Sequence, residues 1–133
     1  MKDKWRVPTI DELTSIIDYT KFRPATELPK MQPSSYWSST TYAGDPDDAW
    51  GVYFDDGVVG SGDKGNYGFY VRCVRGGQSG ELSNFDGKRF LKKKDCYLDK
   101  KTGLEWALEN TGKMTWNDAM AVSDWEVEND TSM

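Results

Sequence analysis

The sequence predicts an α+β fold in which an antiparallel sheet packs against two helices. Three runs rich in aromatic and β-branched residues are separated by turn-forming residues, which is the pattern of a three-stranded meander. Two other segments, one in each half of the chain, begin with a threonine and repeat apolar residues at helical spacing. The predicted strands are residues 36–42, 49–54 and 67–74, and the turn-rich segments between them are 44–48 and 55–66.

The third run is expected to form the last strand of the meander. Its side chains should alternate, because successive residues of a strand point to opposite faces of a sheet. One face would carry Tyr70, Arg72 and Val74, and the other Phe69, Val71, Cys73 and Arg75.

The first helix is predicted to begin after Thr9, with Glu12 at the spacing of a capping box. Its apolar stripe is Ile10, Leu13, Ile16 and Ile17. The second helix begins after Thr115, and its expected inner face is Trp116, Ala119 and Met120. A proline-punctuated connector is expected at 20–35, short strands at 88–91, 96–99 and 104–107, and a polar linker at 78–87.

Size and composition bound the class of protein. A chain of 133 residues predicts a single domain, and six Trp, seven Tyr and five Phe can supply its core although only 37% of residues are hydrophobic. The net charge of −5 argues against nucleic acid or an anionic membrane as the main partner. No apolar run approaches the roughly 18 residues of a membrane span. The first four residues do not begin a signal peptide, which leaves an intracellular protein or one with a removed leader as alternatives.

Cys73 and Cys96 are the two cysteines of the chain. Both lie in predicted strands, so a disulfide is feasible if those strands are neighbours; the alternative is two buried thiols. Because the chain has no histidine, a zinc site would have at most two soft ligands, which is too few for an ordinary one.

Several blocks of the sequence resemble the DUF1566 family, the bacterial module at the C-terminus of the Legionella collagen-like adhesin. That family belongs to the C-type-lectin-like class of folds, which also holds the formylglycine-generating enzymes. The matching blocks are residues 5–9 with 12–13, 36–40, 49–50 and 71–77, together with Asp99, 102–106 and 115–119.

The order of these blocks departs from the family pattern. Residues 88–125 resemble the opening of the module and residues 5–77 its remainder, with 78–87 as the linker. Either the chain is cut across the boundary of a tandem array, or it is a circular permutant of one domain. Since the first and last strands of this fold pair antiparallel, we expect one C-type-lectin-like domain spanning residues 1–133. A monomer and a dimer that exchanges halves are the competing states.

The resemblance implies a non-catalytic binding module of the bacterial surface or adhesin type, located outside the cell or on its surface. We expect it to recognise a glycan or a protein surface through loops 42–68, because a rigid sheet can present loops to a ligand. The predicted ligand-binding residues are Tyr42, Asp45, Asp47, Asp48, Trp50, Tyr53, Asn66 and Tyr67. The sequence favours burial for Trp37 and Trp50 and exposure for Tyr67.

Two charged groups allow alternative interpretations. Asp45, Asp47 and Asp48 could bind calcium, or they could simply be turn residues. The cationic residues could contact a sulfated glycan, or they could protect an exposed strand from aggregation. That set is Lys88, Arg89, Lys92, Lys93, Lys94, Lys100 and Lys101.

Catalysis has little support in the sequence. It has no histidine to act as a base, no glycine-rich phosphate loop and no Gly-x-Ser-x-Gly elbow. The cysteines do not resemble the reactive pair of the sulfatase-activating relatives. We therefore expect no enzyme and no cofactor other than the calcium considered above. The alternative function is a structural or assembly repeat unit of a larger surface or phage protein.

Overall fold

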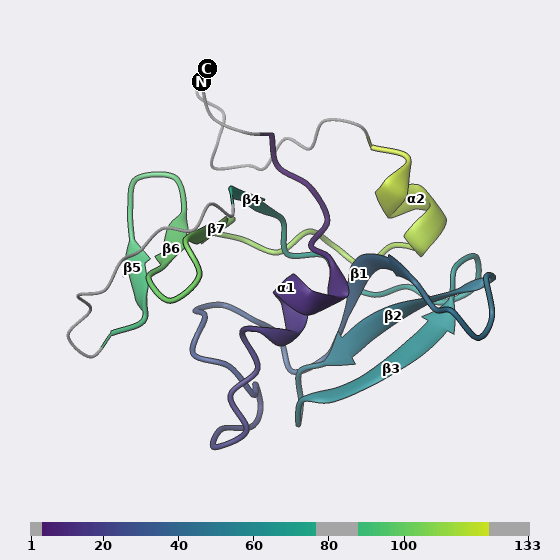
Figure 1. Ribbon diagram of the computed structural model, residues 1–133, viewed down its shortest axis with the longest axis horizontal. Helices are drawn as coiled ribbons and strands as arrows, with labels where there is room; N and C mark the ends of the chain where they lie inside the picture. The colour runs from purple at the N-terminus through teal and green to yellow at the C-terminus, as the bar shows by residue number, and fades with distance from the viewer. Residues whose placement is uncertain (1–3, 77–87, 123–133) are drawn as a thin grey trace.

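The computed structural model describes residues 4–76 and 88–122, which form two antiparallel sheets and two short helices (Figure 1). The polar linker predicted at 78–87 lies outside the described residues. The first half contains α1 (Ile10–Thr14), β1 (Ser35–Thr41), β2 (Asp48–Tyr53), β3 (Val58–Asp63) and β4 (Val74–Gly76). The second half contains β5 (Phe90–Lys92), β6 (Tyr97–Asp99), β7 (Leu104–Trp106) and α2 (Trp116–Met120). In these two ranges, no helix combines the length and apolar character needed to cross a membrane.

The first sheet has the strand order β1-β2-β3, and the predicted third strand at 67–74 is wrong. Its place is taken by Val58–Asp63, where the sequence suggested a turn because of its glycines. One of its two glycines, Gly62, is needed because the Phe69 ring lies against the strand, whereas the space above Gly60 is open. A Cβ at Gly62 would lie 2.9 Å from that ring, and one at Gly51 would lie 2.7 Å from the Tyr36 carbonyl oxygen. Glycine within a strand often marks such a close approach.

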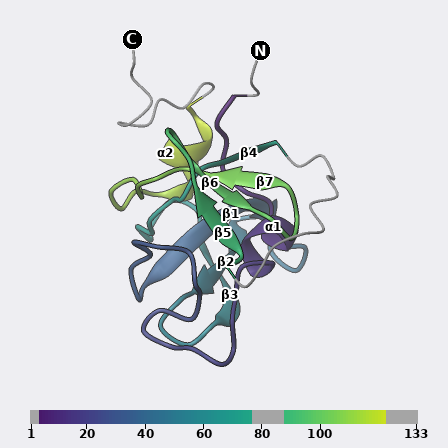
Figure 2. The same ribbon diagram turned by 90° about the vertical axis from the view of Figure 1, so that its left-hand side faces the viewer.

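The second sheet has the order β4-β7-β6-β5 and joins the two halves of the chain (Figure 2). β4 pairs antiparallel with β7, placing Val74 opposite Trp106 and Gly76 opposite Leu104. β4, the last strand of the first half, therefore pairs with β7, a strand of the second half. Antiparallel pairing between the two halves is what we expect of a single domain built from both.

Residues 69–75 separate two hydrophobic cores. Tyr70 and Val74 pack in one core, beside Leu13 and Trp106. Phe69, Val71 and Cys73 pack in the other, with Trp5 and Trp37. The predicted alternation is therefore confirmed, although most of the segment does not pair as a regular strand.

Arg72 is buried between the halves and binds neutral acceptors. Its Nε donates to the Ala107 carbonyl oxygen at 2.7 Å, and its terminal nitrogens donate to Asn110 Oδ1 at 3.2 Å and Leu108 O at 3.3 Å. Burial lowers the pKa of Arg72 to about 10. Since each acceptor belongs to the second half, this one side chain links residues about 35 to 38 positions apart.

The two helices begin where the sequence predicts. Thr9 and Glu12 form the complete capping box of α1, whose residue Leu13 is buried against the first sheet. Thr115 caps α2 by accepting a hydrogen bond from the Asp118 N–H. Of the predicted inner face of α2, Ala119 is buried and Trp116 half-buried, but Met120 is exposed, because the helix ends there after only five residues.

Candidate functional site

The loops predicted to bind a ligand meet at one end of the first sheet. Residues 42–47 connect β1 to β2, and residues 64–68 follow β3. The Lys64 N–H donates to the Asp47 carbonyl oxygen at 2.9 Å, which joins the two loops. Asn66 and Tyr67 are exposed there.

The predicted aromatic residues are nevertheless divided between the two faces of this sheet. Residues opposite each other in an antiparallel pair share a face, so Trp50 lies with Ser61, whereas Tyr53 lies with Val58. Tyr42 packs edge-on against Trp50, with ring centroids 4.7 Å apart. Tyr67 lies on the face opposite to Trp50, because its ring is within contact distance of a Cβ at Gly62, which shares the face of Tyr53.

Two details of the prediction therefore change. The expectation that Trp50 belongs to the core is wrong, because its side chain is only half-buried. The ring that packs against it is that of Tyr42, a loop residue. Tyr53 is exposed but lies at the other end of β2 from the acidic loop, beside Val58. The predicted residues do not form one continuous aromatic platform.

The acidic side chains for which hydrogen bonds are seen accept them from their own turns or from the neighbouring strand. Asp45 Oδ1 accepts the Asp47 N–H at 3.0 Å, and Asp48 Oδ2 accepts the Ser61 hydroxyl at 3.3 Å. Asp63 Oδ1 accepts the N–H groups of Gly65 and Asn66. Among residues 4–76 and 88–122, no three His, Cys, Asp or Glu side chains come together in a way that could hold a metal ion. These contacts favour the turn interpretation of the aspartates.

Cys73 and Cys96 are buried thiols on either side of β7. Val74 and Tyr97 both pair with Trp106, so the strands that follow the two cysteines are not neighbours. Two strand spacings separate them by roughly 10 Å, beyond the reach of a disulfide. Burial raises the pKa of Cys73 to about 12 and that of Cys96 to about 11, so neither thiol is activated as a nucleophile.

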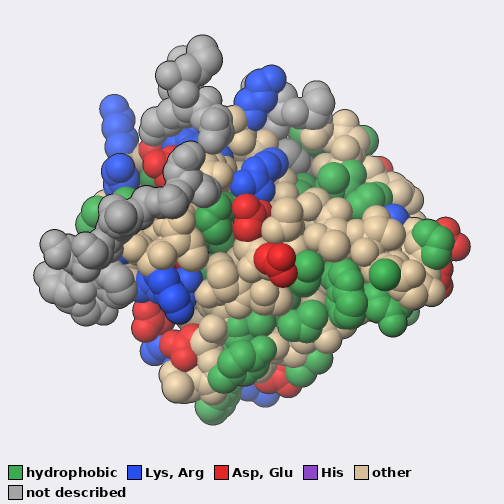
Figure 3. Space-filling model, in the orientation of Figure 1, with side chains coloured by type: hydrophobic (Ala, Val, Ile, Leu, Met, Phe, Trp, Pro, Cys, Tyr) green, Lys and Arg blue, Asp and Glu red, His purple; other side chains and the backbone are tan. Residues whose placement is uncertain are grey.

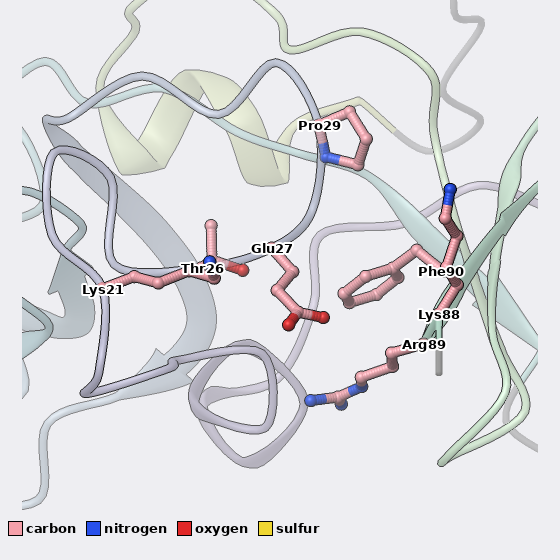
Figure 4. Close-up of a pocket in the computed structure, with 7 residues that line it drawn as sticks. All are labelled: Lys21, Thr26, Glu27, Pro29, Lys88, Arg89 and Phe90. Carbon is pink, nitrogen blue, oxygen red and sulfur yellow. The ribbon is translucent and has the colours of Figure 1, made fainter. Parts of the chain in front are cut away.

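A second candidate site is a basic groove between the connector 21–29 and the β5–β6 hairpin. It consists of two adjoining pockets of about 500 and 680 Å³, which share Pro29, Lys88 and Phe90. Figure 4 shows Lys21 and Glu27 entering the first pocket from the connector, and Arg89 and Phe90 from the opposite strand. The second pocket is completed by Leu91, Lys92, Tyr97 and Lys100.

The charge of the basic groove comes from its lysines. Arg89 binds both carboxylate oxygens of Asp99 at 2.7 Å and also donates to the Ser15 carbonyl oxygen at 3.0 Å. This bidentate pair fixes Arg89 and neutralises it. Lys88 and Lys92 are exposed and flank the apolar surface of Phe90, so the groove has a cationic rim and an aromatic floor.

The sequence identified the lysines and Arg89 of this groove, but not the opposite wall. Lys21, Glu27 and Pro29 belong to the predicted irregular connector, and nothing in that segment indicates which strand it faces. Its prolines fix local φ angles but carry no signal of this contact.

These features define a small α+β module with loops at the end of one sheet and a basic groove beside the other. The model of the Lcl C-terminal domain matches residues 1–75, more than half of the 133 residues. The chain therefore belongs to the Lcl C-terminal domain family, named after the Legionella collagen-like protein. Comparisons with curated proteins and with solved structures found no match.

Family membership identifies the chain as a module of a bacterial surface protein. The match ends within β4, whose hydrogen-bonding partner β7 lies in the unmatched part of the chain.

Proposed function

We propose that this domain is a non-catalytic module that binds an anionic glycan in the basic groove. The observation that carries the proposal is the pair of adjoining pockets, in which lysines surround Phe90 and Tyr97. Sugar-binding grooves need flat apolar surface for the ring faces and polar groups for the substituents. Sulfate or carboxylate groups on the glycan would meet the lysine rim, although the chain as a whole is acidic.

This proposal moves the recognition surface away from loops 42–68. In those loops the aromatic side chains lie on two faces, and the carboxylates of Asp45 and Asp63 already accept hydrogen bonds from their own turns. The absence of histidine and the raised pKa values of both thiols support the proposal that the module catalyses no reaction.

The test is calorimetric titration with dextran sulfate, with unsulfated dextran as the ligand control. We expect binding of the sulfated polymer alone, weakening as salt rises, because exposed charges are screened. The double variant Lys88→Ala/Lys92→Ala should lose up to about tenfold in affinity, at up to about 0.7 kcal/mol per exposed contact. Lys113→Ala is the matched control, since Lys113 is exposed and lies outside the groove. Equal losses in both variants, or equal binding of both polymers, would refute the proposal.

We also infer that residues 5–76 and 88–122 complete one C-type-lectin-like domain in permuted order. The pairing of β4 with β7 and the hydrogen bonds of Arg72 support this arrangement. Light scattering should give a monomer with one cooperative unfolding transition, whereas a dimer would indicate exchanged halves. Millimolar calcium should leave the midpoint unchanged; a rise of several degrees would instead assign a calcium site to the aspartate loop.

A further inference from the structure

β3 is an exposed edge of the first sheet. Its partner is β2, and among the described residues no strand or bridge pairs with its other side. Val58 is 55% exposed and Val59 37%. Edge strands are commonly protected by lysine, proline or a bulge, and Val58–Asp63 contains neither of those residues and pairs with β2 in continuous register. The outer edge of β3 can therefore accept another strand.

A small apolar pocket lies on the face of the sheet and extends from β1 across β2 to this edge strand. It has a volume of about 100 Å³, and its walls include Tyr53, Val58 and Phe69. Gly60 is one of its lining residues, and the space above Gly60 is open, because a Cβ at this position would have no neighbour within 4 Å. In contrast, the space above Gly62 is filled by the Phe69 ring. The pocket thus has room for one aliphatic side chain, at the middle of β3.

Figure 3 shows hydrophobic side chains gathered on the lower right of the molecule, where Figure 1 places β2 and β3. Tyr53, Val58 and Val59 are exposed members of this region. An unpaired edge next to an apolar pocket is the arrangement by which sheets bind extended peptides: the backbone supplies hydrogen bonds, and the pocket selects a side chain.

Charge distinguishes between two occupants of this edge. Asp48 and Asp63 oppose each other at one end of β3. The exposed Asp56 precedes its other end, where the neighbouring Asp55 is paired with Arg23 at 3.7 Å. Two copies of β3 paired antiparallel would bring the acidic end of each strand beside the acidic start of the other. Like charges in such positions are destabilising. A segment with basic residues at both ends would meet opposite charge instead.

We propose that β3 binds an extended peptide segment of another protein by strand addition. The segment carries an aliphatic side chain that enters the pocket over Gly60, and lysine or arginine at each end. This surface shares no lining residue with the basic groove, so the proposal is independent of the glycan-binding function.

The experiment is an NMR titration of the full chain with the synthetic peptide Lys-Thr-Val-Thr-Val-Thr-Lys, blocked at both ends. We expect the largest amide shifts at residues 58–62. The same peptide with glutamate at both ends, and one with proline replacing each central valine, should bind at least about tenfold more weakly, since they lose charge attraction or backbone donors.

Gly60→Leu fills the pocket from within and should reduce peptide affinity at least about tenfold. Its matched control is Gly112→Ala, because Gly112 also has open space around its Cβ position but lies far along the chain from β3. Gly60→Ala provides a second variant that adds a single methyl group without a clash, and it keeps the test valid if Gly60→Leu fails to fold.

Three results would overturn the proposal. These are absence of shifts at residues 58–62 with millimolar peptide, equal binding of the glutamate-ended peptide, and protection of the β3 amides in a concentration-dependent dimer without peptide. The last result would identify a second copy of the chain as the occupant.

Discussion

The sheet β1-β2-β3 comes from one continuous stretch of the chain, whereas the sheet β4-β7-β6-β5 combines strands from both halves. The first has strands of six or seven residues, and the rings of Trp37 and Phe69 pack against each other on it, tilted by 31° with centroids 4.1 Å apart. The second has strands of three residues, and charged side chains reinforce it. Among these, Arg75 binds both Glu105 and Asp95.

This difference indicates two sources of stability. Long local strands can rely on aromatic burial, since neighbouring segments pair with little loss of chain entropy. Short strands brought together from distant segments make few ladder hydrogen bonds, so buried polar contacts must define their register.

Arg72→Ala should destabilise the domain most, by about 3–5 kcal/mol, because it opens a cavity and leaves buried carbonyl groups unpaired. The measurement is urea unfolding followed by tryptophan fluorescence. Arg23→Gln is the control, since the Arg23 side chain is 70% exposed. A loss below about 1 kcal/mol would show that the junction between the halves does not depend on Arg72.

Phe69→Ala should cost about 2–3 kcal/mol, less than a fully buried phenylalanine, because its ring is half-buried. The lost ring would expose the Gly51 and Gly62 surface of the first sheet. Unfolding of this variant is best compared with that of Phe22→Ala, which removes a ring that is 71% exposed. If the two variants were equally stable, Phe69 would not organise the first sheet.

Alkaline pH should weaken the hydrophobic core that contains both thiols. Burial raises the pKa of Cys73 from 9.0 to about 12 and that of Cys96 from 9.0 to about 11, so the folded state holds these protons more tightly than the unfolded chain. Their contribution is complete below pH 9 and is lost as pH rises through 9 to 12, with a total of about 3 kcal/mol lost at pH 10, about half of it from each thiol.

Chemical unfolding at pH 8 and pH 10 measures this loss, and Cys73→Ala/Cys96→Ala should reduce it. Tyr36, in the first sheet, has a pKa raised by burial to about 12 and should contribute only above its ordinary value of 10.0. A pH dependence that persists unchanged in the double variant would contradict the assignment to the thiols.

Thr9→Ala should have the smallest effect, about 1 kcal/mol, because it removes the cap of α1. Thr115→Ala is the comparison in α2, where no reciprocal carboxylate completes a capping box. Thermal unfolding of both variants should show the larger decrease for Thr9; the reverse order would mean that the α1 capping box adds little.

The sequence predicted the features that local chemistry controls. The cap at Thr9, the two long strands at 36–42 and 49–54, and the alternation along residues 69–75 were all confirmed. The strand Val58–Asp63 was missed because its glycines suggested a turn, whereas Gly62 is required by the Phe69 ring, a contact that local sequence does not reveal.

The candidate sites were predicted less completely for the same physical reason. Tyr42 and Tyr53 were identified as neighbours in one loop region, but the register of β2 places them on different faces. The lysines of the basic groove are evident in the sequence, whereas Glu27 and Pro29 reach it through the path of the connector. Tertiary packing, and not local sequence, decides that the connector forms the wall opposite the lysine-rich strand.

The hydrogen bonds of Arg72 have a consequence for biosynthesis. A growing chain emerges from the ribosome in order, so Arg72 appears before Ala107, Leu108 and Asn110, the residues whose oxygen atoms it requires. Until those residues follow, the guanidinium has no partner in the interior and must stay in water. The first sheet can form early from its own segment, but closure of the domain has to await synthesis of Asn110.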